Sequence, residues 1–130
     1  MFASSSSRLN NEYITAAVSL GSLLAIAKMD IVYGGGGIGL MGKLADTVLE
    51  NGGTITGVIP SFMMDEGWDH SNVNEMIITP DMSERKKRMF AMADAVVAMP
   101  GGVGTLEELT EAITLKQLGL FRGPIIILNT

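Results

Sequence analysis

The sequence predicts an α/β fold in which helices cover both faces of a doubly wound, mostly parallel β-sheet. Two patterns support this prediction. Short β-rich apolar segments alternate with helix-compatible segments along the chain. The strand segments are apolar on both faces, as expected for strands buried between two layers of helices. A chain of 130 residues suits one domain, which we expect to span residues 1–130.

The elements are expected to alternate in a regular order. Residues 16–27 are interpreted as an amphipathic helix rather than a signal peptide, because Arg8 is the only early cation and the stretch is too short to span a bilayer. Ser83 is predicted to cap a later helix, and Gly52 and Gly119 to follow helix ends. The remaining strands and helices are expected at residues 30–33, 40–50, 54–59, 76–79, 84–92, 95–99, 105–118 and 125–128.

Residues 61–74 lack the periodicity of a helix or a strand and are predicted to form a long loop. Long loops in compact domains are often functional, which is the first interpretation of this segment. The second is a surface excursion that Trp68 pins to the domain. The serine run at residues 4–7 is predicted to be a loop as well.

Composition excludes several classes of protein. The formal net charge of −5 and the pI of about 4.7 argue against binding of nucleic acid. The chain has no cysteine and His70 is its only histidine, so neither a disulfide nor a zinc site is expected. We predict no metal, no cofactor and no membrane partner, and a cytoplasmic location.

The segment 100–108 follows an apolar strand and opens a helix. Gly101, Gly102 and Gly104 let backbone N–H groups turn toward one point, and Thr105 stands at the helix start. Free N–H groups and the helix dipole favour an anion there, so the segment is predicted to bind a phosphate. Its spacing matches neither a Walker loop nor the dinucleotide fingerprint. The alternative is a tight turn that needs glycine only for its geometry.

Glu108 lies three residues after Thr105, so the two side chains share a helix face. A carboxylate beside a bound phosphate is unfavourable unless it has a task. It is interpreted as a group that orients water or stabilises a cationic transition state. The alternative interpretation is compensation of the helix dipole.

Arg85 and Lys86 stand near the start of another helix, where cations oppose the dipole. This placement predicts a nearby anion, and Arg85 is suited to a bidentate contact with phosphate. The alternative is a solvated helix face that contains an i,i+4 pair between Glu84 and Arg88.

A second glycine run, from Gly34 to Gly42, again follows a strand and opens a helix. Such a run lets chain segments approach one another or a ligand. Gly35 and Gly36 are therefore candidate substrate contacts.

Together, three motifs resemble the LONELY GUY (LOG) family, whose members are often labelled "lysine decarboxylase-like". The motifs occur in the family's order, and the resemblance extends from about Phe2 to Asn129. They are Tyr33-Gly34-Gly35-Gly36-x-x-Gly39-Leu40-Met41-Gly42, Ser83-Glu84-Arg85-Lys86 and Pro100-Gly101-Gly102-x-Gly104-Thr105-x-x-Glu108.

The resemblance implies a Rossmann-like fold, a homodimer and hydrolysis of the N-glycosidic bond of a nucleoside 5′-monophosphate. Cytokinin riboside monophosphate or AMP would yield the free base and ribose 5-phosphate. Arg85 and Glu108 are implied as the catalytic pair, and the loop around Met63, Met64 and Trp68 is expected to shape base selectivity. The implied substrate-binding residues are Lys86, Glu66, Gly35 and Gly36, with Gly101, Gly102, Gly104 and Thr105 on the phosphate.

A decarboxylase is not expected, because a pyridoxal enzyme needs a Schiff-base lysine with partners for the ring and the phosphate. Both chain ends look short beside the family pattern, with only Met1 and Phe2 in place of a first strand and no helix after Thr130. Exposed edges beside a missing central strand and an uncovered sheet face are therefore expected. The alternatives to an active hydrolase are a non-catalytic nucleotide-binding module and an inactive truncated homologue.

Overall fold

The computed structural model describes residues 1–130 and contains every predicted helix and strand. The helices are α1 (Asn11–Ile26), α2 (Gly39–Glu50), α3 (Ser61–Asp65), α4 (Met82–Met92) and α5 (Val103–Gln117). The strands are β1 (Ile31–Tyr33), β2 (Ile55–Pro60), β3 (Glu75–Thr79), β4 (Val96–Ala98) and β5 (Ile125–Ile127). None of the helices combines the length and hydropathy that a membrane crossing requires.

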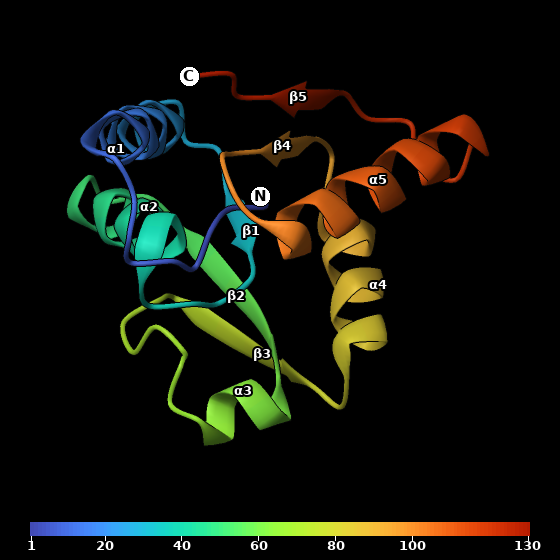
Figure 1. Cartoon of the computed structure of the whole chain (residues 1–130), viewed down its shortest axis with the longest axis horizontal. Coiled ribbons are helices and arrows are strands. Elements are labelled where there is room, and N and C mark those ends of the chain that lie inside the picture. Colours follow the sequence, from blue (N-terminus) through green and yellow to red (C-terminus); the bar gives the residue numbers. More distant parts are fainter.

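All strand pairs are parallel, which confirms the predicted sheet type. One sheet has the order β1-β2-β3 and the other pairs β4 with β5. Figure 1 shows α1 and α2 on one side of the strands and α4 and α5 on the other. The domain therefore has the predicted layered architecture, with helices on both faces of parallel strands.

The N-terminal segment lies between the two sheets and joins them. The Phe2 N–H donates to the Val97 carbonyl at 2.9 Å, and the Phe2 carbonyl accepts from the Met99 N–H at 2.8 Å. On the other side, the Met1 nitrogen donates to the Val32 carbonyl of β1. The expectation of exposed edges beside a missing central strand is therefore wrong here, because a few residues bond to both neighbouring strands. β5 at the far side remains open, with Ile126 and Ile127 50% and 60% exposed.

The core consists of two clusters of buried apolar side chains. The larger cluster joins α1 and α2 to β1 and β2, and the smaller joins α4, α5 and β4 to the middle of β2. Three aromatic rings stack edge-to-face in the smaller cluster, with centroids 5.8 and 6.2 Å apart. The cluster members are Ala3, Ala17, Ile31, Tyr33, Leu40, Leu44, Ala45, Val48, Ile55 and Met99, and then Phe2, Val58, Met89, Val96, Ala112 and Phe121.

The start of α4 differs from its predicted form. Asp81, not Ser83, caps the helix, and its carboxylate accepts from the Glu84 N–H at 2.8 Å. Ser83 already lies inside the helix. Glu84 also pairs with Lys87 at 3.3 Å, in place of the predicted pair with Arg88.

Candidate active site

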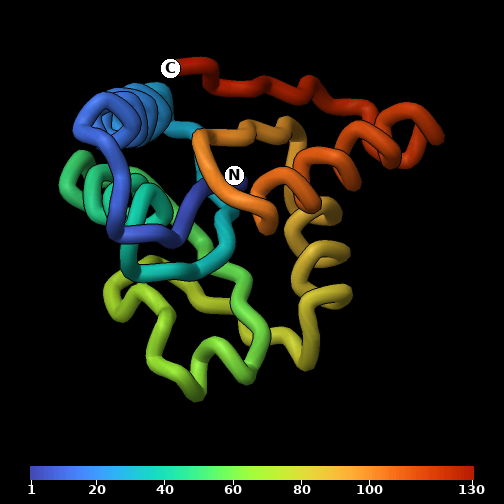
Figure 2. The backbone as a smooth tube through the Cα atoms, in the orientation of Figure 1, coloured from blue at the N-terminus to red at the C-terminus, as the bar shows by residue number.

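A cavity of about 610 Å³ lies at the carboxyl ends of the strands. Its walls come from residues 1–6, the turn after β1, the segment after β2, the start of α4 and the start of α5. Figure 2 shows the N-terminal segment, the turn before α2 and the start of α5 coming together there. Parallel sheets place ligands at this edge, and the volume falls within the roughly 300–1,000 Å³ usual for small-molecule sites.

Arg85 of α4 lines the cavity and is only 5% exposed. Its Nε donates to the Val58 carbonyl of β2 at 2.9 Å, and its Nη2 donates to the Gly34 carbonyl after β1 at 2.6 Å. Gly34 allows this approach, because a Cβ at that position would lie 2.3 Å from Nη2. Burial lowers the pKa of the Arg85 guanidinium, and the Glu108 carboxylate opposes this effect. The result is a fixed buried cation with N–H donors left for a ligand.

Glu108 of α5 lines the same cavity and is half-buried. Burial raises the pKa of this carboxyl, and the Arg85 guanidinium lowers it by less. No salt bridge joins the two groups, so their charges face the cavity without neutralising one another directly. A carboxyl with a raised pKa in a cavity is suited to accept or donate a proton.

The glycine loop before α5 forms another part of the cavity wall. Gly102, Gly104 and Thr105 line it, and Gly102 is the N-cap of α5. No side chain caps this helix, so its first N–H groups are open to an anion. Gly101 does not line the cavity; it lies against Thr105, whose Oγ1 would be 2.1 Å from a Cβ at that position.

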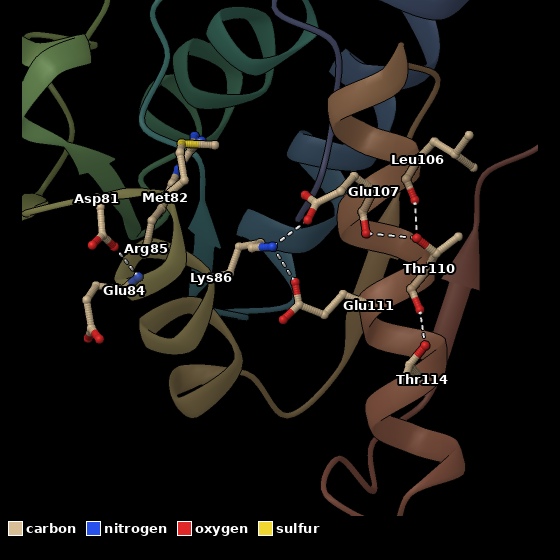
Figure 3. A network of polar contacts seen from close by, with 10 residues as sticks. All are labelled: Asp81, Met82, Glu84, Arg85, Lys86, Leu106, Glu107, Thr110, Glu111 and Thr114. Carbon is tan, nitrogen blue, oxygen red and sulfur yellow. Dashed lines mark hydrogen bonds and ion pairs between the residues drawn. The ribbon is translucent and has the colours of Figure 1, made fainter.

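Lys86 points away from the cavity, although it follows Arg85 directly in the sequence. Its ammonium pairs with Glu107 and lies 2.7 Å from Oε2 of Glu111. Figure 3 shows this side chain reaching from α4 to the two glutamates on α5. These bonds raise the pKa of Lys86, with the hydrogen bond to Glu107 as the largest cause. Substrate binding by Lys86 stays a prediction, and its observed contacts instead hold α4 against α5.

Gly35 and Glu66, two further predicted substrate contacts, also lie outside the cavity lining. Gly36 lines the cavity, but Gly35 turns its carbonyl to the N–H of His70 at 2.8 Å. Glu66 is exposed at the end of α3, and its predicted role near the substrate stays a prediction.

Sequence reasoning missed much of the apolar part of the cavity. The segment 61–74 begins with a single turn of helix, α3, which is too short for its periodicity to be seen. Met63 and Trp68 from this segment line the cavity as expected, whereas Met64 does not. Contributions that were not predicted come from Met1 to Ser6, Ile38, Met41, Ile59 and Met82. No local signal identifies these residues, because only the packing of distant segments brings them together.

Parallel strands, helices on both faces and a glycine loop that opens a helix beside a cavity define a Rossmann-like α/β protein. Residues 41–130 match the family described as "Possible lysine decarboxylase". The chain therefore belongs to this family, the one that the three sequence motifs identify as LONELY GUY.

Two curated relatives match nearly the whole chain. Over 129 residues it is 45% identical to "Probable cytokinin riboside 5'-monophosphate phosphoribohydrolase LOGL9" of Oryza sativa subsp. japonica, covering 99% of this chain and 57% of that protein. It is 43% identical to cytokinin riboside 5'-monophosphate phosphoribohydrolase LOG7 of Arabidopsis thaliana, covering 99% of this chain and 59% of that protein. The chain thus spans somewhat more than half the length of these relatives.

Two solved structures share the fold. The molybdenum cofactor binding protein of Rippkaea orientalis superposes with a TM-score of 0.75 and 24% identity, over 95% of this chain and 71% of that one. The molybdenum cofactor carrier protein of Chlamydomonas reinhardtii superposes with a TM-score of 0.76 and 24% identity, over 98% and 72% of the two chains. This likeness confirms the Rossmann-like architecture and shows the fold alone.

Replacing Lys86 with methionine tests its structural role. We expect Lys86→Met to lower the free energy of unfolding by about 1–2 kcal/mol, because it leaves the buried Oε2 of Glu111 without its polar partner. Lys87→Met is the matched control, since its pair with Glu84 is exposed and should cost less than about 0.5 kcal/mol. Urea unfolding measures both. Equal losses in the two variants would contradict the role of Lys86.

The raised pKa of Glu108 predicts a pH-dependent effect on stability. Glu108 has a higher pKa in the folded than in the unfolded chain. The free energy of unfolding should therefore fall as pH rises from the unfolded-state pKa to the folded-state pKa of this carboxyl. Glu108→Gln cannot ionise, so we expect a higher free energy of unfolding than in the unmodified chain at pH 7 and a smaller difference near pH 4. Glu66→Gln, at an exposed site, is the control. A less stable Glu108→Gln protein at pH 7 would contradict the prediction.

Proposed function

We propose that this chain hydrolyses the N-glycosidic bond of a nucleoside 5′-monophosphate and releases the free base and ribose 5-phosphate. The observation that carries the proposal is the meeting of three features in one cavity. These are the glycine loop at the start of α5, the half-buried Glu108 carboxyl and the buried Arg85 guanidinium. A site for phosphate beside an acid–base group and a fixed cation suits cleavage of a phosphorylated substrate.

The curated relatives support the same reaction. Both carry names that describe a cytokinin riboside 5′-monophosphate phosphoribohydrolase. This chain matches a little more than half of each relative, and that matched part contains Arg85, Glu108 and the glycine loop. We therefore propose cytokinin riboside monophosphate or AMP as the substrate class.

In the proposed mechanism, the phosphate is anchored by the N–H groups of Gly102 to Thr105 and by the Thr105 hydroxyl. Binding a remote group in this way fixes the ribose relative to the charged side chains. Arg85 cannot swing with the ligand, because two backbone carbonyls hold it. Its remaining N–H groups would contact the phosphate or the ribose hydroxyls and balance negative charge.

Glu108 acts on the bond that breaks. As the C1′–N bond lengthens, its electron pair leaves with the base and positive charge develops on the ribose. The Glu108 carboxylate stabilises that charge and accepts a proton from the attacking water, whose oxygen joins C1′. Glu108 then passes the proton that it accepted from the water to the leaving nitrogen of the base, so the products are neutral base and ribose 5-phosphate and the carboxylate is regenerated.

The family description mentions lysine decarboxylase, but the cavity does not fit pyridoxal chemistry. That chemistry requires a lysine amine that can form a Schiff base with the cofactor. No lysine lines the cavity, and the nearby Lys86 is held as an ammonium by Glu107 and Glu111. The proposed reaction therefore involves no pyridoxal cofactor.

We also propose that the protein is a cytoplasmic homodimer. Large apolar side chains are exposed on α5, on the turn after it and on β5, and a second copy could cover them. They are Val103, Leu106, Ile113, Leu118, Leu120, Ile126 and Ile127.

The catalytic assignment predicts a large effect of Glu108→Gln. We expect release of adenine from AMP to fall by about 10²–10⁴-fold, because the amide can neither accept a proton nor carry negative charge. Glu12→Gln, at an exposed position of α1 outside the cavity lining, is the control. A base-release assay with AMP and isopentenyl-AMP measures both proteins. Undiminished turnover in Glu108→Gln would overturn the assignment, and binding without turnover in the unmodified chain would indicate a non-catalytic module.

If α5 forms the dimer interface, a charge introduced on this helix should dissociate the dimer. Ile113 is 47% exposed in the middle of the helix, so Ile113→Glu should convert the dimer to a monomer by placing a charge in an apolar interface. Ser71→Glu adds the same charge at an exposed loop position outside α5 and β5 and serves as the control. Size-exclusion chromatography with light scattering gives the mass of each. A monomeric unmodified protein would contradict the proposal.

A further inference from the structure

Trp68 has an unusual place for a large aromatic side chain. It is the only tryptophan in the chain and is 51% exposed, yet it lines the cavity. It therefore does not act as the buried pin of a surface loop, which was one of the two interpretations of the segment 61–74. The exposed indole instead offers a flat apolar surface to whatever occupies the cavity.

Backbone hydrogen bonds hold this tryptophan in place. The Trp68 carbonyl accepts from the Gly37 N–H at 3.0 Å, and the Trp68 N–H donates to the Met63 carbonyl at 3.2 Å. The next residue, Asp69, forms an antiparallel bridge with Gly36. The segment around Trp68 is thus bonded to the glycine turn after β1 on one side and to α3 on the other.

His70 adds a side-chain anchor to the same segment. It is buried, and its Nε2 lies 2.7 Å from Oδ1 of Asp46 on α2. Its Nδ1 accepts from the Asn72 N–H at 3.1 Å, so Nε2 is the nitrogen that donates to the carboxylate. The only histidine of the chain therefore ties the loop to α2, two residues after Trp68.

Other parts of the cavity lining are apolar as well. Outside residues 1–6 and α5, the other large uncharged side chains of the lining come from the start of α2, the end of β2, α3 and the start of α4, where the Met82 sulfur also contacts Arg85. They are Ile38, Met41, Ile59, Met63 and Met82. The charged and N–H-rich walls belong instead to Arg85 and the start of α5. A ligand with a polar phosphate end and a flat apolar end matches this division.

We propose that Trp68 is the base-contacting, specificity-determining residue of this site, held by the Gly35–Gly37 turn and His70 so that its indole stacks on the nucleobase. This inference rests on the proposed function for the orientation of the nucleotide. A wall without charged or amide side chains selects by stacking area and shape rather than by hydrogen bonds to the base edge. Purine monophosphates should therefore bind more tightly than pyrimidine monophosphates.

The fluorescence of this single tryptophan gives a direct test. In Glu108→Gln protein, which leaves the substrate intact, AMP should quench the Trp68 emission more strongly than CMP does. Ribose 5-phosphate should leave the emission unchanged while raising the AMP concentration needed for quenching. Emission that does not respond to saturating AMP would overturn the proposal.

Kinetics of substituted proteins give the second test. Trp68→Ala should raise KM for AMP by roughly 5- to 100-fold, the range of base–aromatic stacking, while inhibition by ribose 5-phosphate stays unchanged. Trp68→Phe should recover most of the loss. Phe62→Ala is the matched control, since Phe62 is a similarly exposed aromatic residue, 49%, outside the cavity lining. Equal weakening of AMP and ribose 5-phosphate binding in Trp68→Ala would overturn the proposal.

The two proposals can fail separately. If AMP quenches Trp68 but the unmodified chain releases no base, the hydrolase proposal fails and the base contact stands. If base is released with the same KM in the unmodified and Trp68→Ala proteins, the base contact fails and the hydrolase stands.

Discussion

The site depends on the buried guanidinium of Arg85. Two backbone carbonyls hold it, one on Val58 within β2 and one on Gly34 directly after β1, so α4 is fixed to both strands at one point. Burying a cation costs desolvation free energy unless its N–H donors find acceptors. The two carbonyls accept hydrogen bonds from Arg85 and so offset part of this cost, but they do not neutralise its charge. The charge, which no ion pair neutralises, is then available to a ligand in the cavity. Any side chain at residue 34 would displace it, which explains a glycine at that position.

The same cation connects the electrostatics of α4 and α5. Arg85 and Glu108 influence one another's pKa, and the residues beside them, Lys86 and Glu107, form the ion pair that links the helices. Adjacent residues on each helix thus have separate tasks, one directed into the cavity and one directed to the partner helix. The ion pair between Lys86 and Glu107 thus helps to position the Glu108 carboxyl relative to the Arg85 guanidinium. A ligand in the cavity need not contact this ion pair.

Much of this architecture follows from local patterns, but its assembly does not. The strands and most helices were predictable because their apolar runs and glycine stops are local signals. The choice between Asp81 and Ser83 as the cap was not, because both residue types suit that role. The contacts of Lys86 with Glu107 and Glu111 were not predictable either, because charge and motif do not reveal the direction of a helical side chain; its binding of substrate stays a prediction. The apolar wall was missed where it depends on contacts between distant segments.

The two halves of the cavity arise from different parts of the fold. Segments after β3 and β4 carry the charged groups and the glycine loop, whereas the end of β2 and the segments after β1 and β2 carry most of the apolar wall, to which α4 adds Met82. The wall is held mainly by backbone hydrogen bonds, such as that between Gly37 and Trp68. Side chains there can therefore change without moving the backbone, while Arg85 cannot change without losing two strand contacts. The fold thus allows the base preference to vary while the groups proposed for bond cleavage stay fixed.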